Sequence, residues 1–188
     1  MKGNEMTEQK YANPGPWDDE PDSLDWEYRE YRCHIKRHPS AGHLCGYASP
    51  SPEHPWCGKN YSDRVYIPDL ENRKVNIDKV GAINVFCASL GCDLEAGLAE
   101  ISLVLEAHGG ITFSGPLDGQ PDAAWWFGFD CAHCDDRSPG YDKFHRYGGD
   151  TYRDMPYVKT EVERLVDQLI EVATWPQAET EIVPSPPA

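Results

Sequence analysis

The sequence predicts an α+β domain, in which an antiparallel sheet with long loops carries a C-terminal amphipathic helix on one face. Three observations support this fold class. Apolar and polar residues alternate over residues 28–37, aromatic residues crowd residues 125–130, and apolar residues recur at helical spacing after residue 160. Short alternating segments joined by turn-forming residues are typical of antiparallel strands, and a helix with one apolar stripe needs a surface that covers it.

The chain has 188 residues, which fits one domain of ordinary size with two tails. Residues 1–26 are polar, acidic and proline-containing, and residues 175–188 are rich in proline. Such segments bury too little apolar area to offset the entropy that is lost on ordering. We therefore expect a disordered acidic tail over 1–26, a single α+β domain over 27–174 and a disordered proline-rich tail over 175–188.

The first strands are predicted from alternation and from turn residues. Apolar residues alternate with charged ones over residues 28–37, which indicates a half-buried strand. A turn over residues 39–42 should return the chain as a second strand over residues 43–47. The prolines of residues 49–55 predict a loop, because proline cannot donate a ladder hydrogen bond. A short strand is expected over residues 64–67.

The middle of the chain is ambiguous, since residues 76–107 fit both helical and strand patterns. We expect helices before residue 100 and a strand from about residue 101. The β-branched and aromatic residues of 111–113 and 125–130 favour two further strands. In the second of these, Trp126 should point to one face, and Phe127 and Phe129 to the other.

The last predicted element is the clearest helix. A capping box formed by Thr160 and Glu163 is expected at its start. Its apolar stripe consists of Val162, Leu165, Val166, Leu169, Ile170 and Ala173. This stripe should pack across one face of the sheet.

Composition excludes some classes of function. Asp and Glu number 32 against 17 Lys and Arg, and the formal net charge of -15 argues against binding to a nucleic-acid backbone. It favours a basic host protein as partner, and the alternative partner is a small anionic ligand at a local site. No apolar run approaches the roughly 20 residues of a membrane span. Seven scattered cysteines and no signal-peptide pattern lead us to expect a cytoplasmic protein without membrane contact.

Three loop segments carry the candidate site. Each contains a histidine, at His54, His108 and His133. Imidazoles on loops, with carboxylates nearby, are typical ligands of zinc or another divalent metal. We therefore predict these three histidines as metal ligands.

Neighbouring residues suggest the remaining roles. Asp130, Cys131 and Asp136 are the candidate catalytic residues, with a carboxylate that activates water. Gly109 and Gly110 would let backbone N–H groups approach a bound ligand closely.

Alternatives for the same segment remain open. Cys131 as a nucleophile is less favoured, because nearby carboxylates raise a thiol pKa. A structural zinc on Cys131 and Cys134 would need Cys45 with Cys57 or His54 as further ligands. The segment is equally compatible with a strand end whose cysteines only pack.

Several motifs resemble a family of small uncharacterised proteins from phages and bacteria, over roughly residues 28–172. They are Gly46-Tyr47, His54-Pro55, Gly58, His108-Gly109-Gly110-Ile111-Thr112, the run from Trp125 to His133, Asp136, Tyr152-Arg153 and Tyr157-Val158. The resemblance implies a phage-encoded context such as counter-defence, but it implies no reaction. Cys134 departs from the family pattern, which favours a site made of His54, His108, Asp130, His133 and Asp136.

These observations predict a metal-dependent hydrolase that acts on a small anionic or nucleotide-like substrate. The alternatives are a non-enzymatic acidic protein that sequesters a ligand or a basic partner protein, and a structural zinc domain.

Overall fold

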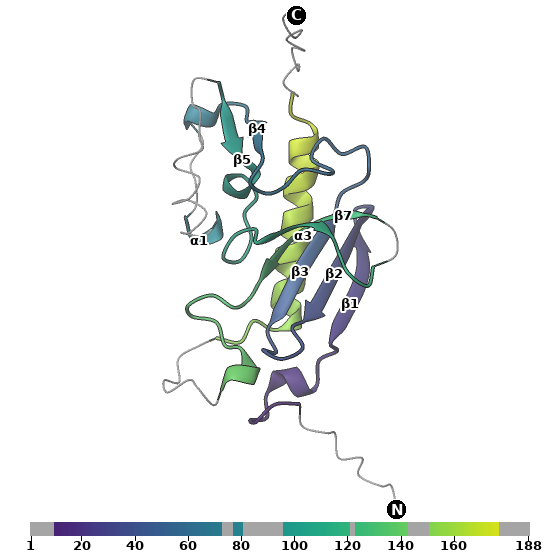
Figure 1. Ribbon diagram of the computed structural model, residues 1–188, viewed down its shortest axis with the longest axis vertical. Helices are drawn as coiled ribbons and strands as arrows, with labels where there is room; N and C mark the ends of the chain where they lie inside the picture. The colour runs from purple at the N-terminus through teal and green to yellow at the C-terminus, as the bar shows by residue number, and fades with distance from the viewer. Residues whose placement is uncertain (1–9, 73–76, 81–95, 121–122, 143–150, 177–188) are drawn as a thin grey trace, which may run out of the picture.

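The computed structural model describes residues 10–72, 77–80, 96–120, 123–142 and 151–176 (Figure 1). It confirms the α+β class. A five-stranded antiparallel sheet has the order β1-β2-β3-β7-β6, and a two-stranded sheet pairs β4 with β5. Figure 1 shows α3 running along one face of the larger sheet.

The larger sheet contains β1 (Ser23–Tyr28), β2 (Tyr31–Arg37), β3 (Leu44–Ser49), β7 (Trp125–Asp130) and β6 (Phe113–Pro116). The smaller sheet contains β4 (Arg64–Tyr66) and β5 (Leu98–Glu100). The helices are α1 (Ile77–Val80) and α3 (Met155–Ala173), with single 3-10 turns at Pro16–Asp18, Leu70–Asn72, Ile101–Leu103 and Pro139–Tyr141.

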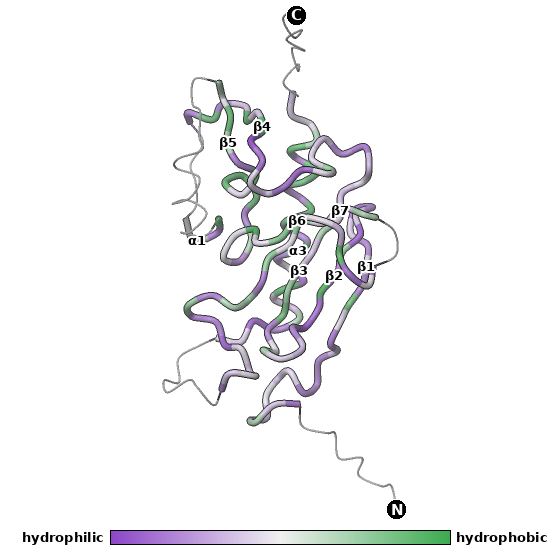
Figure 2. Tube along the Cα trace, in the orientation of Figure 1, coloured by the Kyte–Doolittle hydropathy of each residue, from purple (hydrophilic) through white to green (hydrophobic). Residues whose placement is uncertain are grey.

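The core lies between the larger sheet and α3. Gly46 lets the helix approach β3, because a Cβ on this glycine would lie 2.6 Å from the Val162 side chain and 2.7 Å from that of Phe129. Figure 2 shows hydrophobic and hydrophilic residues alternating along α3, as one covered and one solvent-facing side require. The buried residues at this contact are Cys33, Ile35, Leu44, Ala48, Phe127, Phe129, Val158, Val162, Leu165, Val166 and Leu169.

The alternation predicted for β7 is confirmed. Phe127 and Phe129 belong to the core under α3. Trp126 lies on the opposite face, where its ring meets that of His34 edge-on at 6.3 Å. The aromatic side chains of β7 therefore lie on both faces of the sheet. The loop that follows β7 begins at the edge of the core.

The ordered domain begins earlier than the predicted residue 27. Residues 23–28 form β1, and Trp17 is only 1% exposed. The acidic segment is ordered because its aromatic and charged side chains find partners far along the chain, which composition does not reveal. Residues 1–9 and 177–188 lie outside the described residues, and Trp175 packs edge-on against Trp56 at 6.0 Å.

The strand predicted from residue 101 is wrong. The strand β5 ends at Glu100, and Ile101–Leu103 form a 3-10 turn. Ile101, Val104 and Leu105 are all buried, which a turn allows and an alternating strand does not. Of the helices predicted before residue 100, α1 is described, and residues 81–95 lie outside the described residues. The prediction is wrong for Leu98–Glu100, which form β5.

The helix α3 begins six residues, nearly two turns, before the predicted capping box. Asp154 is its N-cap, and its carboxylate accepts a 2.9 Å hydrogen bond from the Tyr157 N–H. The Thr160 hydroxyl donates instead to the Pro156 carbonyl, inside the helix. The buried stripe continues through Val172 and leaves Ala173 exposed.

No helix among the described residues combines the length and apolar character needed to cross a membrane.

Candidate metal centre

Three segments that are distant in sequence meet near the start of α3. His108 follows the 3-10 turn after β5, His133 and Asp136 follow β7, and Arg153 precedes the N-cap of α3. One side-chain ligand atom each from His108, His133 and Asp136 lies within 4.8 Å of the others. This trio can hold a metal ion, because imidazole nitrogen and carboxylate oxygen are ordinary zinc ligands. Two of the three predicted metal ligands are therefore brought together.

The Asp136 carboxylate is the centre of the cluster, and only 2% of its side chain is exposed. Its Oδ2 atom accepts hydrogen bonds from His108 Nε2 at 2.6 Å and from the His133 backbone N–H at 3.0 Å. Its Oδ1 atom accepts one from Arg153 Nε at 2.9 Å. Burial would raise the pKa of Asp136, but these hydrogen bonds outweigh it and hold the pKa well below its ordinary value. The group is a carboxylate at neutral pH.

One ring nitrogen of His133 makes only a long polar contact. Its Nδ1 atom is buried, has no hydrogen-bond partner in the described part of the chain, and lies 3.5 Å from Asp136 Oδ2. The Asp136 carboxylate raises the pKa of His133, although burial opposes this. Its side chain remains 34% exposed, so solvent reaches one side of the ring. A buried ring nitrogen with no closer polar contact is open to a water molecule or an ion.

The loop after β7 is irregular but held by backbone hydrogen bonds. The Cys131 N–H donates to the Leu44 carbonyl at 3.0 Å, which continues the pairing with β3 by one residue. The Asp136 N–H donates to the His133 carbonyl at 3.0 Å and closes a tight turn. Asp136 then forms a parallel bridge with Thr151. The turn presents both site residues on the same side.

The segment before His108 is held by α3. Gln168 binds both backbone groups of Glu106, donating to its carbonyl and accepting from its N–H at 2.7 Å each. The Tyr157 hydroxyl lies 3.0 Å from His108 Nδ1. Contacts from α3 therefore hold both the backbone before His108 and the orientation of the His108 ring.

Gly109 and Gly110 have a different role from the predicted one. Gly110 donates its N–H to the Ala107 carbonyl at 3.1 Å, so this group is occupied within the loop. Gly109 has a φ of 68° and packs against the His133 ring, and a Cβ there would lie 2.1 Å from the ring carbon Cε1. Gly109 lets the two loops that carry His108 and His133 approach each other. The prediction that the Gly110 N–H binds a ligand is wrong, because this N–H is bonded within the loop.

His54 is not part of the centre, and its assignment as a metal ligand is wrong. Its Nε2 atom donates to the Leu169 carbonyl at 2.9 Å, and its Nδ1 atom accepts from the Trp56 N–H at 3.0 Å. Burial lowers its pKa, so the ring is neutral and fits this donor and acceptor pattern. His54 attaches its proline-rich loop to the end of α3.

Replacing His54 with glutamine is expected to lower the free energy of unfolding by about 1–3 kcal/mol, because a buried carbonyl or N–H loses its partner. Metal binding should be unchanged. Urea denaturation and a metal titration of the same preparation measure the two quantities. Loss of the metal in a folded variant would contradict the structural role.

Asp130 and Cys131 do not join the trio. Asp130 accepts hydrogen bonds from the Thr112 hydroxyl at 3.0 Å and from the Ala132 N–H at 3.1 Å. Cys131 is 1% exposed in the core, and burial raises its pKa well above the ordinary value, so a nucleophilic thiolate is disfavoured. Within the described ranges, His108, His133 and Asp136 form the only group of metal-ligating side chains that gathers, so the four-ligand zinc site on Cys131 and Cys134 is not formed there.

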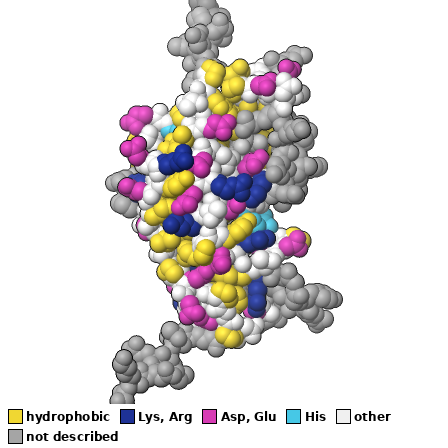
Figure 3. Space-filling model, turned by 180° about the vertical axis from the view of Figure 1, so that it is seen from behind, with side chains coloured by type: hydrophobic (Ala, Val, Ile, Leu, Met, Phe, Trp, Pro, Cys, Tyr) yellow, Lys and Arg dark blue, Asp and Glu magenta, His cyan; other side chains and the backbone are white. Residues whose placement is uncertain are grey.

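Two residues of the site, Arg153 and Tyr157, were not assigned a role from sequence. Arg153 supports Asp136, Tyr157 supports His108, and the Arg153 guanidinium lies 5.0 Å above the Tyr157 ring. Both stand in the motifs Tyr152-Arg153 and Tyr157-Val158, which were the available signal. Figure 3 shows basic and acidic side chains interspersed over this face of the molecule, with a small exposed area of histidine side chains among them.

Comparisons with known proteins identify no relative. No model of a protein family, no curated protein and no solved structure matches this chain. The function is therefore argued from the residues of the site.

Proposed function

We propose that the protein is a metal-dependent hydrolase in which His108, His133 and Asp136 hold zinc or another divalent ion and which acts on a small anionic or nucleotide-like substrate. One observation carries the proposal. The buried Nδ1 atom of His133 has no hydrogen-bond partner among the described residues and faces, at 3.5 Å, the same Asp136 oxygen that binds His108. Three donors thus converge on one point.

The spacing of the donors supports this assignment. Tetrahedral zinc with bonds of about 2.0–2.1 Å keeps its nitrogen and oxygen ligands about 3.3 Å apart. The 3.5 Å separation of His133 Nδ1 from Asp136 Oδ2 is close to that value. The 2.6 Å contact between His108 Nε2 and Asp136 Oδ2 is a hydrogen bond, and it would open by less than about 1 Å if an ion took the place of the proton.

The groups behind the ligands also support it. Metal-bound histidines usually engage their second ring nitrogen, and metal-bound carboxylates are usually hydrogen-bonded through the other oxygen. Here Tyr157 occupies the Nδ1 side of His108 at 3.0 Å, and Arg153 occupies Oδ1 of Asp136 at 2.9 Å. Both ligands are therefore held in place before an ion binds.

Three protein ligands leave a coordination position for water, and a bound divalent ion lowers the pKa of that water enough to form a nucleophile near neutral pH. Solvent reaches the centre past the partly exposed His133 ring. One carboxylate neutralises only half of the charge of a divalent ion, and the Arg153 guanidinium adds a positive charge beside it. This local excess of positive charge favours an anionic substrate, such as a phosphate ester, despite the acidic net charge of the chain.

The test is a titration of metal-free, untagged protein with zinc, manganese and cobalt, followed by an assay with p-nitrophenyl phosphate esters. We expect one ion per chain and hydrolysis only with the ion bound. His133→Ala should lower metal affinity more than about 100-fold, since loss of an outer-shell partner alone costs 10–100-fold. His54→Gln is the matched control and should keep both properties.

Two results would overturn the proposal. The first is a wild-type protein that binds none of the three ions. The second is a folded His133→Ala variant with unchanged affinity or unchanged hydrolysis.

A further inference from the structure

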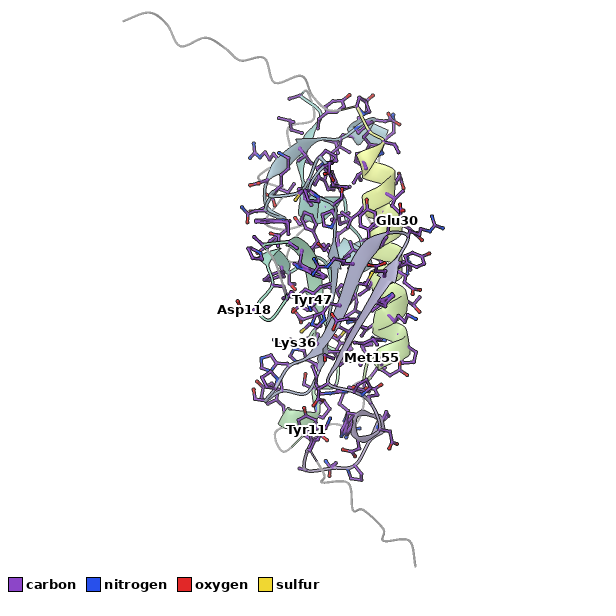
Figure 4. All side chains as sticks on the ribbon, turned by 90° about the vertical axis from the view of Figure 1, so that its right-hand side faces the viewer. Tyr11, Glu30, Lys36, Tyr47, Asp118 and Met155 are labelled. Atoms are coloured by element: carbon purple, nitrogen blue, oxygen red, sulfur yellow. The ribbon has the colours of Figure 1, made fainter. Side chains whose placement is uncertain are left out.

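The N-terminal segment lies against the start of α3, at the same end of the molecule as the candidate centre. Figure 4 labels Tyr11 in this segment and Met155 at the first turn of the helix, both toward the same end. Trp17 is 1% exposed, and its ring meets the Tyr152 ring edge-on at 5.0 Å. The Arg137 guanidinium covers the Trp17 ring at 4.9 Å. The segment is therefore packed onto residues next to the site.

Glu20 makes the polar contacts of this segment with the helix. Its Oε1 atom accepts a hydrogen bond from the Met155 N–H at 2.8 Å, in the first turn of α3. Its Oε2 atom accepts from the Tyr152 hydroxyl at 2.5 Å and from Arg37 Nη2 at 3.0 Å. The Glu20 side chain is 13% exposed and that of Arg37 is 2% exposed, so solvent screens this ion pair weakly.

Two partners of Glu20, Tyr152 and Met155, lie on either side of the residues that support the centre. Arg153 and Asp154 lie between Tyr152 and Met155. Arg153 holds Asp136, and Asp154 caps the turn that carries Tyr157. Fixing residues 152 and 155 restricts the backbone between them, and with it the point from which the Arg153 side chain reaches Asp136.

We propose that Glu20 is a positioning residue of the metal centre, acting through Tyr152 and Met155 on Arg153 and thereby on Asp136. The expected effect of Glu20 on metal affinity rests on the proposed function, whereas its expected effect on the position of Arg153 does not. The negative charge matters because one oxygen serves both the Tyr152 hydroxyl and the Arg37 guanidinium, two donors. A glutamine keeps one acceptor oxygen and turns an NH2 group toward a donor, so one of these contacts is lost.

The experiment compares Glu20→Gln with Asp19→Asn, which makes the same charge change at the neighbouring, exposed position. In metal-free protein, the ¹⁵N–¹H signal of Arg153 Nε reports the hydrogen bond to Asp136. We expect this signal to shift or broaden in Glu20→Gln and to stay in place in Asp19→Asn. Cobalt affinity should fall about 10-fold in Glu20→Gln, the lower end of the effect of an outer-shell partner.

Tyr152→Phe provides a second variant, because it removes only the hydroxyl and keeps the ring against Trp17. It should move the Arg153 signal in the same direction, and it tests the idea even if Glu20→Gln does not fold. An unchanged Arg153 signal and cobalt affinity in the folded variants would overturn the positioning role. Absence of metal binding by the wild type, with the Arg153 signal still moved in Glu20→Gln, would support the positioning of Arg153 by Glu20 and would overturn the metal centre and the hydrolase.

Discussion

Asp136→Asn is expected to abolish metal binding and to lower the free energy of unfolding by about 3 kcal/mol, the lower end of the cost of breaking a buried charge pair. The carboxylate accepts from His108, His133 and Arg153 in a position where its side chain is 2% exposed. Asparagine has the same shape, but it carries no charge and one of its two polar atoms is a donor. The Arg153 guanidinium then loses its charged partner.

The effect should depend on pH in a defined direction. The pKa of Asp136 is lowered in the folded protein, so its carboxylate contributes stability above the ordinary pKa of about 3.9 and loses that contribution as the pH falls toward the folded value. The difference in unfolding free energy between wild type and Asp136→Asn should be largest above about pH 4 and should shrink below it. Urea denaturation between pH 3 and pH 7 measures this.

The matched control is Asp130→Asn, which changes the other carboxylate near the end of β7. Asp130 bonds only Thr112 and Ala132 among the described hydrogen bonds and lies outside the trio. This variant should keep the metal and lose about 1 kcal/mol. Equal losses of stability and of metal in both variants would show that the loop, and not Asp136, is what matters.

Gly109→Ala is expected to separate the two histidines and to lower metal affinity at least about 10-fold, as displacement of a supporting contact does. The added Cβ would lie 2.1–2.4 Å from three atoms of the His133 ring, so the ring must move away from Asp136. The backbone adds its own cost of about 1–2 kcal/mol, because alanine is unfavourable at a φ of 68°.

Gly58→Ala separates these two causes. Gly58 has a similar φ of 84°, and a Cβ there would meet nothing within 4 Å. It should show the backbone cost without any loss of metal affinity. The measurements are a cobalt titration and thermal unfolding of both variants. If Gly109→Ala retains wild-type affinity, the contact between the Gly109 loop and His133 is not needed for the centre.

The secondary structure was predictable where a local pattern had no competitor. The alternating run of β7 and the apolar stripe of α3 through Leu165 and Leu169 are both found as predicted. The predicted start of α3 was wrong because Thr160 and Glu163 have the spacing of a capping box. The N-cap is Asp154, which is followed by a proline in the first turn. Which hydroxyl or carboxylate caps a helix depends on where the chain enters it, and the spacing of residues does not show this.

The three histidines carried nearly the same local signal, and the structure separates them. His54 satisfies both ring nitrogens within the protein, one of them with a carbonyl 115 residues away. His133 keeps one nitrogen without a described partner beside Asp136. A histidine in a polar loop is therefore a candidate ligand until its hydrogen-bond partners are known, and these partners are distant in sequence.

Periodicity and composition were sufficient for the α+β class, for the two faces of β7 and for the apolar side of the C-terminal helix, because burial repeats along a strand or a helix with a regular period. The choice of Asp136 over Asp130, the inclusion of Arg153 and Tyr157, and the attachment of the N-terminal segment through Glu20 required the tertiary structure. The loop after β7 has no period that fixes where its side chains point. The partners of Asp136 come from residues up to 28 positions away, and those of Glu20 from residues up to 135 positions away, so their contacts exist only once the sheet and the helix have packed.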